Sequence, residues 1–245
     1  MRRFYCRKDD IANGYINITE AREIHHIKNV LRMELKDKLV FSANDGFEYN
    51  GHISRIEPEC IAVKIDSENI LGGDNALGCS IVLACAIPKK AKIDYIIEKV
   101  TELGVDEFIP LKTKRTIVNL KGREESRLRR WRNIAVASSK QSGRIKIPKI
   151  HGVLTFGEAV DYAEDFDLKI IPNLARKKIH IYDLLSQKRY GRIAIFIGPE
   201  GDFTQDEIAL AFEHGFIGVS LGENTLKVDT AAISTVSFCA FWKTK

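Results

Sequence analysis

The sequence lacks the features that mark a membrane-spanning, secreted or zinc-binding protein. No run of about 18 apolar residues occurs, so no transmembrane helix is expected. The basic residues 1–8 lead into no apolar core, so we expect no secretory signal. No two cysteines are spaced as CxxC, which argues against a zinc knuckle or a disulfide framework. We expect free thiols in a reducing cytoplasm at Cys6, Cys60, Cys79, Cys85 and Cys239.

Common phosphate-binding and metal-binding patterns are also missing. Neither GxGxxG nor GxxxxGK followed by Ser or Thr is present, so a Rossmann dinucleotide site or a P-loop is not supported. His25 and His26 are adjacent, and neighbours on a helix point about 100° apart, so they cannot easily share an ion. His151, His180 and His214 have no clustered acidic or thiol partners. We therefore expect no metal site.

What is present is an ordinary globular composition with an uneven distribution of charge. The 245 residues are 44% hydrophobic and 29% charged, which is typical of a soluble protein with one or two domains. The formal net charge is only +5, but residues 112–149 hold thirteen Lys and Arg against two acids, Glu124 and Glu125. Such a basic segment favours binding to a polyanion. The alternative interpretation is a solvated helix face.

Hydrophobic patterns divide the chain into two predicted domains. Residues 1–67 hold short strands and one helix, which residues 19–23 open and whose apolar residues repeat at 24–31, as in a small β-barrel. Residues 68–78 contain three glycines and two asparagines, which indicates a linker. Residues 79–245 alternate strands with helices, which predicts an α/β domain with a parallel sheet and helices on both of its faces. Its clearest predicted strands are 81–87, 108–110, 168–172 and 192–197, and its clearest helices are 93–103 and 124–141.

Two predicted strand-to-helix loops are candidate binding sites. A buried strand ends in the Gly-Pro-Glu-Gly sequence of residues 198–201, and a helix with a Thr204 capping box starts at once. A second loop, 222–228, leads into a last helix that Asp229 or Thr230 should cap. Ligands of open parallel sheets bind beyond the carboxyl ends of the strands, where such loops lie. The last helix is so apolar that we expect it either in the core or against another subunit.

Four motifs occur in one order over nearly the whole chain. They are residues 26–32 (His-Ile-Lys-Asn-Val-Leu-Arg), residues 99–105 (Lys-Val-Thr-Glu-Leu-Gly-Val), Arg130-Trp131 with residues 141–144 (Gln-Ser-Gly-Arg), and residues 198–201 with 221–222 and 226–231 (Leu-Lys-Val-Asp-Thr-Ala). Together they resemble the family of ribosomal RNA small subunit methyltransferase E, within the SPOUT class of methyltransferases. Four ordered motifs are more specific than any one of them.

The resemblance implies a fold, a reaction and partners. It implies a PUA-like barrel before an α/β domain tied in a trefoil knot, with S-adenosylmethionine bound in the knot. It implies methylation of N3 of a specific uridine in 16S ribosomal RNA of the small subunit, by a homodimer joined through the C-terminal domain. The cofactor residues that it implies are Ile171, Pro172, Ile197, Gly198, Pro199, Glu200, Gly201, Leu221, Gly222, Leu226 and Thr230.

Cations are the candidates for catalysis and for RNA contact. A cation beside the uracil oxygens would stabilise the anion that develops there, and the candidates are Lys227 and Arg144. Arginine binds phosphates bidentately and stacks on bases. The candidates for RNA contact are Arg2, Arg3, His26, Arg32, Arg123, Arg127, Arg130 and Arg132.

The chain departs from the family pattern at Asp202, Lys227 and Asp229, where the family usually has glycine, arginine and glutamate. If position 202 needs a positive φ, aspartate tolerates it better than most residues. Two alternatives stay open. One is a SPOUT methyltransferase that acts on another RNA, and the other is a non-catalytic RNA-binding assembly factor that kept the fold.

Overall fold

The computed structural model separates into two compact units, Met1–Ala76 with Lys140–Lys146, and Leu77–Ser139 with Ile147–Lys245. The residues that the structure describes are 2–43, 47–70, 79–89, 92–118, 120, 122–144, 146–172, 179–186 and 189–243. Most of the predicted linker at 68–78 lies outside them, and the predicted domain boundaries stay predictions. No local pattern in the sequence indicates that residues 140–146 group with the first unit.

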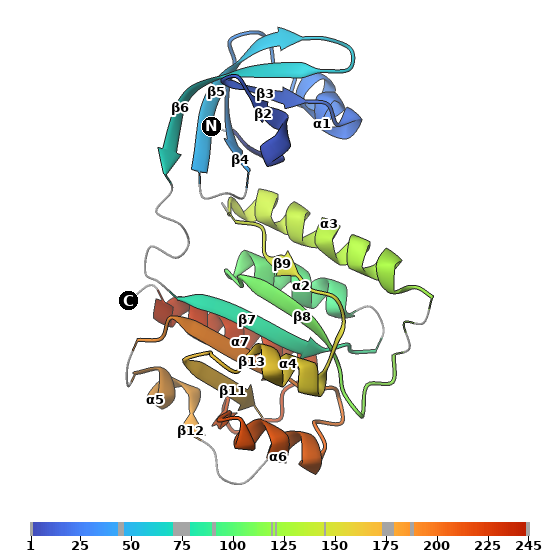
Figure 1. Ribbon diagram of the computed structural model, residues 1–245, viewed down its shortest axis with the longest axis vertical. Coiled ribbons are helices and arrows are strands. Elements are labelled where there is room, and N and C mark those ends of the chain that lie inside the picture. Colours follow the sequence, from blue (N-terminus) through green and yellow to red (C-terminus); the bar gives the residue numbers. More distant parts are fainter. Residues whose placement is uncertain are drawn as a thin grey trace. The chain divides into compact units, whose positions relative to one another are not determined.

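The first unit is built on a curled, mostly antiparallel sheet (Figure 1). Its strands follow the order β1-β4-β5-β6-β3-β2, and only β1 and β4 run parallel. Ile16, Leu39, Phe41, Ile53 and Ile61 are buried in its core. The elements are β1 (Arg2–Tyr5), a 3-10 helix (Lys8–Asp10), β2 (Ile11–Ala12), β3 (Tyr15–Ile18), β4 (Lys38–Ser42), β5 (Phe47–Ile56) and β6 (Ile61–Ile70).

Strands β5 and β6 pair with two irregularities, and the first of them needs a glycine. The register shifts between Asn50 and Gly51. A Cβ atom at Gly51 would lie 2.4 Å from the carbonyl oxygen of Lys64, so the strands can approach this closely only without a side chain. Such irregularities increase the local twist of a sheet, which accounts for its curl.

The predicted helix at 24–31 is present in two parts. Helix α1 (Ala21–His25) continues as a π-helical turn (His26–Val30). Arg32, two residues after its end, has a φ of +51°. Backbone of this kind is uncommon outside glycine and is frequent at functional sites.

The second unit is a wholly parallel sheet in the order β10-β8-β7-β13-β11-β14-β12, with β9 also paired to β8. Its strands are β7 (Ser80–Ala86), β8 (Glu107–Lys112), β9 (Lys149–Ile150), β10 (Leu154–Thr155), β11 (Leu168–Pro172), β12 (Ile179–His180), β13 (Arg192–Ile197) and β14 (Ile217–Ser220). Its helices are α2 (Lys92–Glu102), α3 (Glu124–Ser142), α4 (Phe156–Tyr162), α5 (Ile181–Ser186), α6 (Gln205–Glu213) and α7 (Val228–Lys243).

Helices cover both faces of this sheet, as predicted (Figure 1). Ile81 and Leu83 of β7 belong to one apolar layer with residues of α2, α3, α5 and α7. Val82 and Ala84 belong to the other, with residues of α4 and α6. This alternation explains why β7 reads as a continuous apolar run. The trefoil knot stays a prediction.

The last helix starts earlier than predicted. Helix α7 begins at Val228, so Asp229 and Thr230 lie in its first turn and the prediction that one of them caps it was wrong. Lys227 accepts the first helical hydrogen bond, from the amide of Ala231 at 2.8 Å. Within the part of the chain that the structure describes, no helix has the length and apolar character needed to cross a bilayer.

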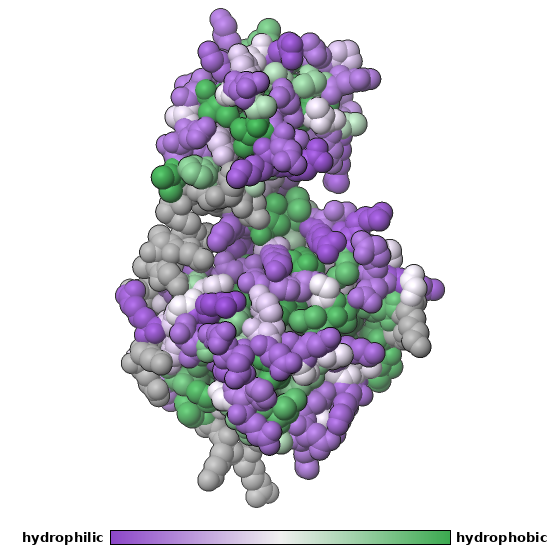
Figure 2. Space-filling model, in the orientation of Figure 1, coloured by the Kyte–Doolittle hydropathy of each residue, from purple (hydrophilic) through white to green (hydrophobic). Residues whose placement is uncertain are grey.

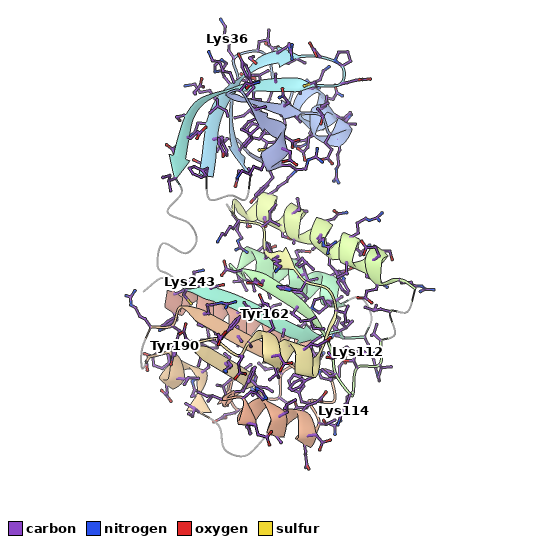
Figure 3. The ribbon with its side chains drawn as sticks, in the orientation of Figure 1. Lys36, Lys112, Lys114, Tyr162, Tyr190 and Lys243 are labelled. Atoms are coloured by element: carbon purple, nitrogen blue, oxygen red, sulfur yellow. The ribbon has the colours of Figure 1, made fainter. Side chains whose placement is uncertain are left out.

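A hydrogen-bonded cluster joins strand β8 to two later segments. Glu107 opens β8, and its Oε2 accepts bonds from His151 Nε2 at 2.5 Å and from the hydroxyl of Tyr162 at 2.6 Å (Figure 3). These two donors lower the pKa of Glu107 from 4.5 to about 2, because they stabilise its charged form. Burial, and then the bond to the charged Glu107, raise the pKa of Tyr162 to about 12.

This cluster predicts a pH-dependent contribution to stability. We expect Glu107→Gln to lower the free energy of unfolding at pH 7 by about 1–3 kcal/mol. A carboxylate whose pKa is lower in the folded state stabilises the fold above its unfolded pKa and loses that effect as the pH falls. The deficit should therefore shrink between about pH 4.5 and pH 2. Urea unfolding at several pH values measures it, and a deficit that does not change with pH would contradict the assignment.

Candidate functional site

A cavity of about 400 Å³ opens where three parallel strands of the second unit end. Pro172 ends β11, Ile197 ends β13 and Ser220 ends β14, and all three line it. Its volume lies within the roughly 300–1,000 Å³ of small-molecule sites. The carboxyl edge of a parallel sheet is also where ligands of such folds bind.

The cavity brings together eight of the eleven cofactor residues that the resemblance implied. The eight are Pro172, Ile197, Gly198, Pro199, Glu200, Leu221, Gly222 and Leu226. Ile171, Gly201 and Thr230 do not line it. Ile171 is fully buried in the apolar layer beneath α4 and α6, and Thr230 is exposed in the first turn of α7.

The loop of residues 198–203 makes one wall, and its backbone turns sharply. The amide of Asp202 donates to the carbonyl of Pro199 at 2.9 Å, and Asp202 has a φ of +61°. Position 202 therefore does need a positive φ, which aspartate tolerates better than most residues do. Its Oδ1 accepts a bond from the amide of Phe203 at 2.8 Å. Phe203 is 3% exposed and fixes the end of the loop in the core.

Helix α6 follows the loop and starts as predicted. Thr204 accepts a bond from the amide of Glu207, whose side chain in turn accepts one from the amide of Thr204, so the capping box is confirmed. The second oxygen of Glu207 accepts a bond from the amide of Lys114 at 2.8 Å. The helix start is therefore bonded to the turn that follows β8.

Glu200 connects the loop to another strand of the sheet. Its Oε1 accepts a bond from the amide of Lys89, just beyond β7, at 3.1 Å. Glu200 also lines the cavity, so its carboxylate can both hold the loop and face a ligand.

Residues 221–228 make the opposite wall. Gly222 has a φ of +130°, a conformation that suits glycine, and both its amide and its carbonyl bond to the hydroxyl of Ser220. Lys227 is exposed and lines the cavity. Lys92 of α2 lines it too and forms an ion pair with Asp229 at 3.5 Å. Lys92 was not predicted as a cavity residue, because no motif around it in the sequence indicates that it lies at the carboxyl edge of the sheet.

Cys85 is a poor nucleophile for chemistry at this cavity. Its side chain is fully buried at the end of β7. Burial raises the pKa of the Cys85 thiol far above its usual range, and the negative charges of Glu200 and Asp229 act in the same direction. The thiol therefore stays protonated at neutral pH.

The predicted RNA-contacting cations lie in both units. In the second unit Arg123 and Arg132 are exposed and Arg127 is half-buried on α3, whereas Arg130 donates to Asp94 at 2.8 Å. Hydrophilic residues cover most of the visible face of the molecule (Figure 2). In the first unit His26 and Arg32 are exposed. The side chains of Arg2 and Arg3 lie outside the described residues.

Two further residues of the family motifs, Trp131 and Arg144, are almost fully buried. Trp131 is 1% exposed, and its indole nitrogen donates to Asp94 at 3.1 Å. Arg144 is 7% exposed in the first unit, and its carbonyl accepts a bond from the hydroxyl of Tyr5. Arg144 is not among the residues that line the cavity.

Comparison with known proteins identifies the family. Residues 75–240 match the RNA methyltransferase domain, and residues 18–66 match the RNA methyltransferase PUA domain. The chain is 29% identical to ribosomal RNA small subunit methyltransferase E of Bacillus subtilis over 97% of this chain and 96% of that protein. It is 31% identical to the protein of the same name from Mesomycoplasma hyopneumoniae, over 88% of this chain and 90% of that one.

A solved structure agrees with the sequence relatives. The crystal structure of ribosomal RNA small subunit methyltransferase E from Neisseria gonorrhoeae bound to S-adenosyl methionine matches with a TM-score of 0.80 and 26% identity. The match covers 97% of this chain and 95% of that one. The chain therefore belongs to the ribosomal RNA small subunit methyltransferase E family, with a PUA domain followed by an RNA methyltransferase domain.

Proposed function

We propose that this protein binds S-adenosylmethionine in the cavity at the carboxyl edge of the parallel sheet and methylates N3 of a specific uridine in 16S ribosomal RNA. The observation that supports this most is the convergence of eight implied cofactor residues on one cavity. The Neisseria gonorrhoeae relative is bound to S-adenosyl methionine, which supports the same cofactor here.

The cavity residues suit a cofactor with an apolar ring and a positive charge. Leu221, Leu226 and Val228 offer apolar surface for the adenine. The carboxylates of Glu200 and Asp202 favour a cation nearby. Gly222 leaves backbone groups open to close approach, with nothing within 4 Å of where its Cβ would be.

The protein's part in the reaction is mainly to position and to stabilise charge. When bound, S-adenosylmethionine supplies a methyl group made electrophilic by the sulfonium. The loops at 198–203 and 221–228 would hold it beside the target base. In a duplex N3 of uridine is buried in the base pair, so the target must be single-stranded or flipped out. The N3 proton leaves to solvent in this proposal.

Lys227 is the favoured catalytic cation. It lines the cavity and is exposed at its rim, where its ammonium can approach the oxygens of a docked uracil. Arg144 is the second candidate. Arg144 would have to reach the uracil in another way than Lys227, because it is 7% exposed and belongs to the other unit.

The exposed cations of each unit are the proposed contacts to RNA. Arg123 just before α3, Arg127 and Arg132 on α3, and His26 and Arg32 after α1 would bind phosphates. We give Arg130 a weaker role, since Asp94 already accepts its Nε hydrogen. A cytoplasmic location follows from this proposal, because the small ribosomal subunit is the substrate.

We also propose that the protein is a homodimer joined through its C-terminal domain. Phe241 and Phe238 of α7 and Tyr182 of α5 are 71%, 37% and 60% exposed and lie around one apolar groove. An exposed apolar patch of this kind is typical of a protein interface.

The direct test of the function uses small ribosomal subunits from cells that lack this gene. Purified protein and labelled S-adenosylmethionine are added, and mass spectrometry locates any methylated nucleotide. We expect one new N3-methyluridine in 16S RNA. Transfer to a different RNA would support the alternative substrate, and absence of both transfer and cofactor binding would support the non-catalytic assembly factor.

The role of Lys227 is tested by removing and then retaining its charge. We expect Lys227→Ala to lower the turnover number about 10²–10³-fold while changing cofactor affinity little, because the cation acts on the developing anion. Lys227→Arg keeps the charge and should retain most of the turnover. Single-turnover kinetics and calorimetry separate the two quantities, and normal turnover in the alanine variant would remove Lys227 from the mechanism.

The dimer is tested by placing a charge in the apolar groove. We expect Phe241→Glu to convert the dimer to a monomer, because an unpaired carboxylate would be buried at the interface. Phe212→Glu is the matched control, since Phe212 is 44% exposed on α6 and outside this groove. Light scattering after gel filtration gives the mass, and an unchanged dimer in Phe241→Glu would place the interface elsewhere.

A further inference from the structure

Arg115 binds the back of the loop that lines the cavity. It lies in the turn after β8, and its Nη1 donates to the carbonyl of Gly201 at 2.5 Å and to that of Phe203 at 3.3 Å. Both carbonyls belong to the loop of residues 198–203. Sequence analysis did not select Arg115 for any site.

The position of Gly201 shows on which side of the loop Arg115 lies. Gly198, Pro199, Glu200 and Asp202 line the cavity, whereas neither Gly201 nor Arg115 does. A Cβ at Gly201 would lie 3.5 Å from Cδ of Arg115, so the arginine stem packs against the loop there. Arg115 therefore contacts the loop from outside the cavity and leaves its inner face to a ligand.

The turn that carries Arg115 is itself fixed. The hydroxyl of Thr116 accepts a bond from the amide of Thr113 at 3.0 Å and closes the turn. The amide of Lys114 donates to Glu207 at 2.8 Å, and its Nζ pairs with Asp206 at 2.7 Å. Both acids are in the first turn of α6, beside which Lys114 lies in Figure 3. Arg115 thus projects from a turn that is anchored next to the loop.

The loop needs such support because its own backbone provides little. Within residues 198–203, all of which the structure describes, the backbone–backbone hydrogen bond is the one from the amide of Asp202 to the carbonyl of Pro199, and Asp202 holds a left-handed φ. A non-glycine residue in this conformation costs free energy and persists only where neighbouring groups hold it. Two carbonyls bonded to one guanidinium restrict the loop at residues 201 and 203, on both sides of Asp202.

We propose that Arg115 is a positioning residue that presets the loop of residues 198–203 for S-adenosylmethionine. The inference rests on the proposed function, because it assigns the cavity to that cofactor. Arg115 acts through the backbone of the loop and does not touch the ligand. Holding the loop in its binding conformation before the cofactor arrives removes the ordering cost from binding.

The test compares Arg115→Ala and Arg115→Lys with Lys112→Ala in the full-length protein. Lys112 is an exposed cation at the end of β8, so its removal changes the charge equally without touching the loop (Figure 3). Calorimetry gives the affinity for S-adenosylmethionine. Hydrogen exchange of the cofactor-free protein gives the protection of the loop amides, and thermal unfolding reports on the whole fold.

We expect Arg115→Ala to bind S-adenosylmethionine about tenfold more weakly, as two hydrogen bonds from a charged donor are lost. Its KM for the cofactor should rise while its kcat at saturation changes less than about twofold, because the loss is in binding before the transition state. Loop amides should exchange faster, and the melting temperature should stay near that of the wild type. Arg115→Lys should be intermediate and Lys112→Ala unchanged.

Affinity within twofold of the wild type in Arg115→Ala, with unchanged loop exchange, would overturn the inference. A melting temperature that falls in Arg115→Ala and in Arg115→Lys alike, with exchange faster throughout the second unit, would show a structural role and also overturn it. Failure of the wild type to bind S-adenosylmethionine would refute the proposed function instead. That outcome is distinct, because loop exchange in the cofactor-free variants is measured independently.

Discussion

The parallel sheet of the second unit, buried on both faces, is the constraint on which the site depends. Side chains of β7 enter two apolar layers in alternation, Ile81 and Leu83 on one side and Val82 and Ala84 on the other. Helices cover both faces, so ligands reach such a sheet at its ends. Because parallel strands all end at one edge, the end of β11 and the loops after β13 and β14 meet there and line the cavity.

The walls of the cavity combine unusual backbone with support from outside. Asp202 and Gly222 both have positive φ, in the two loops that face each other across the cavity. Glu200 bonds to the segment after β7, and Glu207 and Arg115 bond the loop and the start of α6 to the turn after β8. Strained backbone persists at binding sites when its surroundings hold it in this way. The loop is thus held in place by hydrogen bonds to the segments that follow β7 and β8.

Sequence-based prediction succeeded where a segment is long and its pattern is local. The buried run of β7, the apolar stripe of α2 and the capping box at Thr204 were all predicted, since each reflects burial or bonding among near neighbours. Strands β9, β10 and β12 were missed, because two residues carry no periodicity. The start of α7 was misplaced, because Val228, 6% exposed, is fixed by packing in the core and not by a local capping pattern of the sequence.

The sequence by itself determined which segments are buried, where helices start at capping residues, and which loops carry the family's motifs. The tertiary structure alone decided which of those segments meet. It put β13 between β7 and β11, placed Lys92 at the cavity, and set Arg115 against Gly201, 86 positions away. It also joined Arg130 to Asp94. The physical reason is that burial and capping depend on neighbours along the chain, whereas contacts between distant groups depend on the order of the strands.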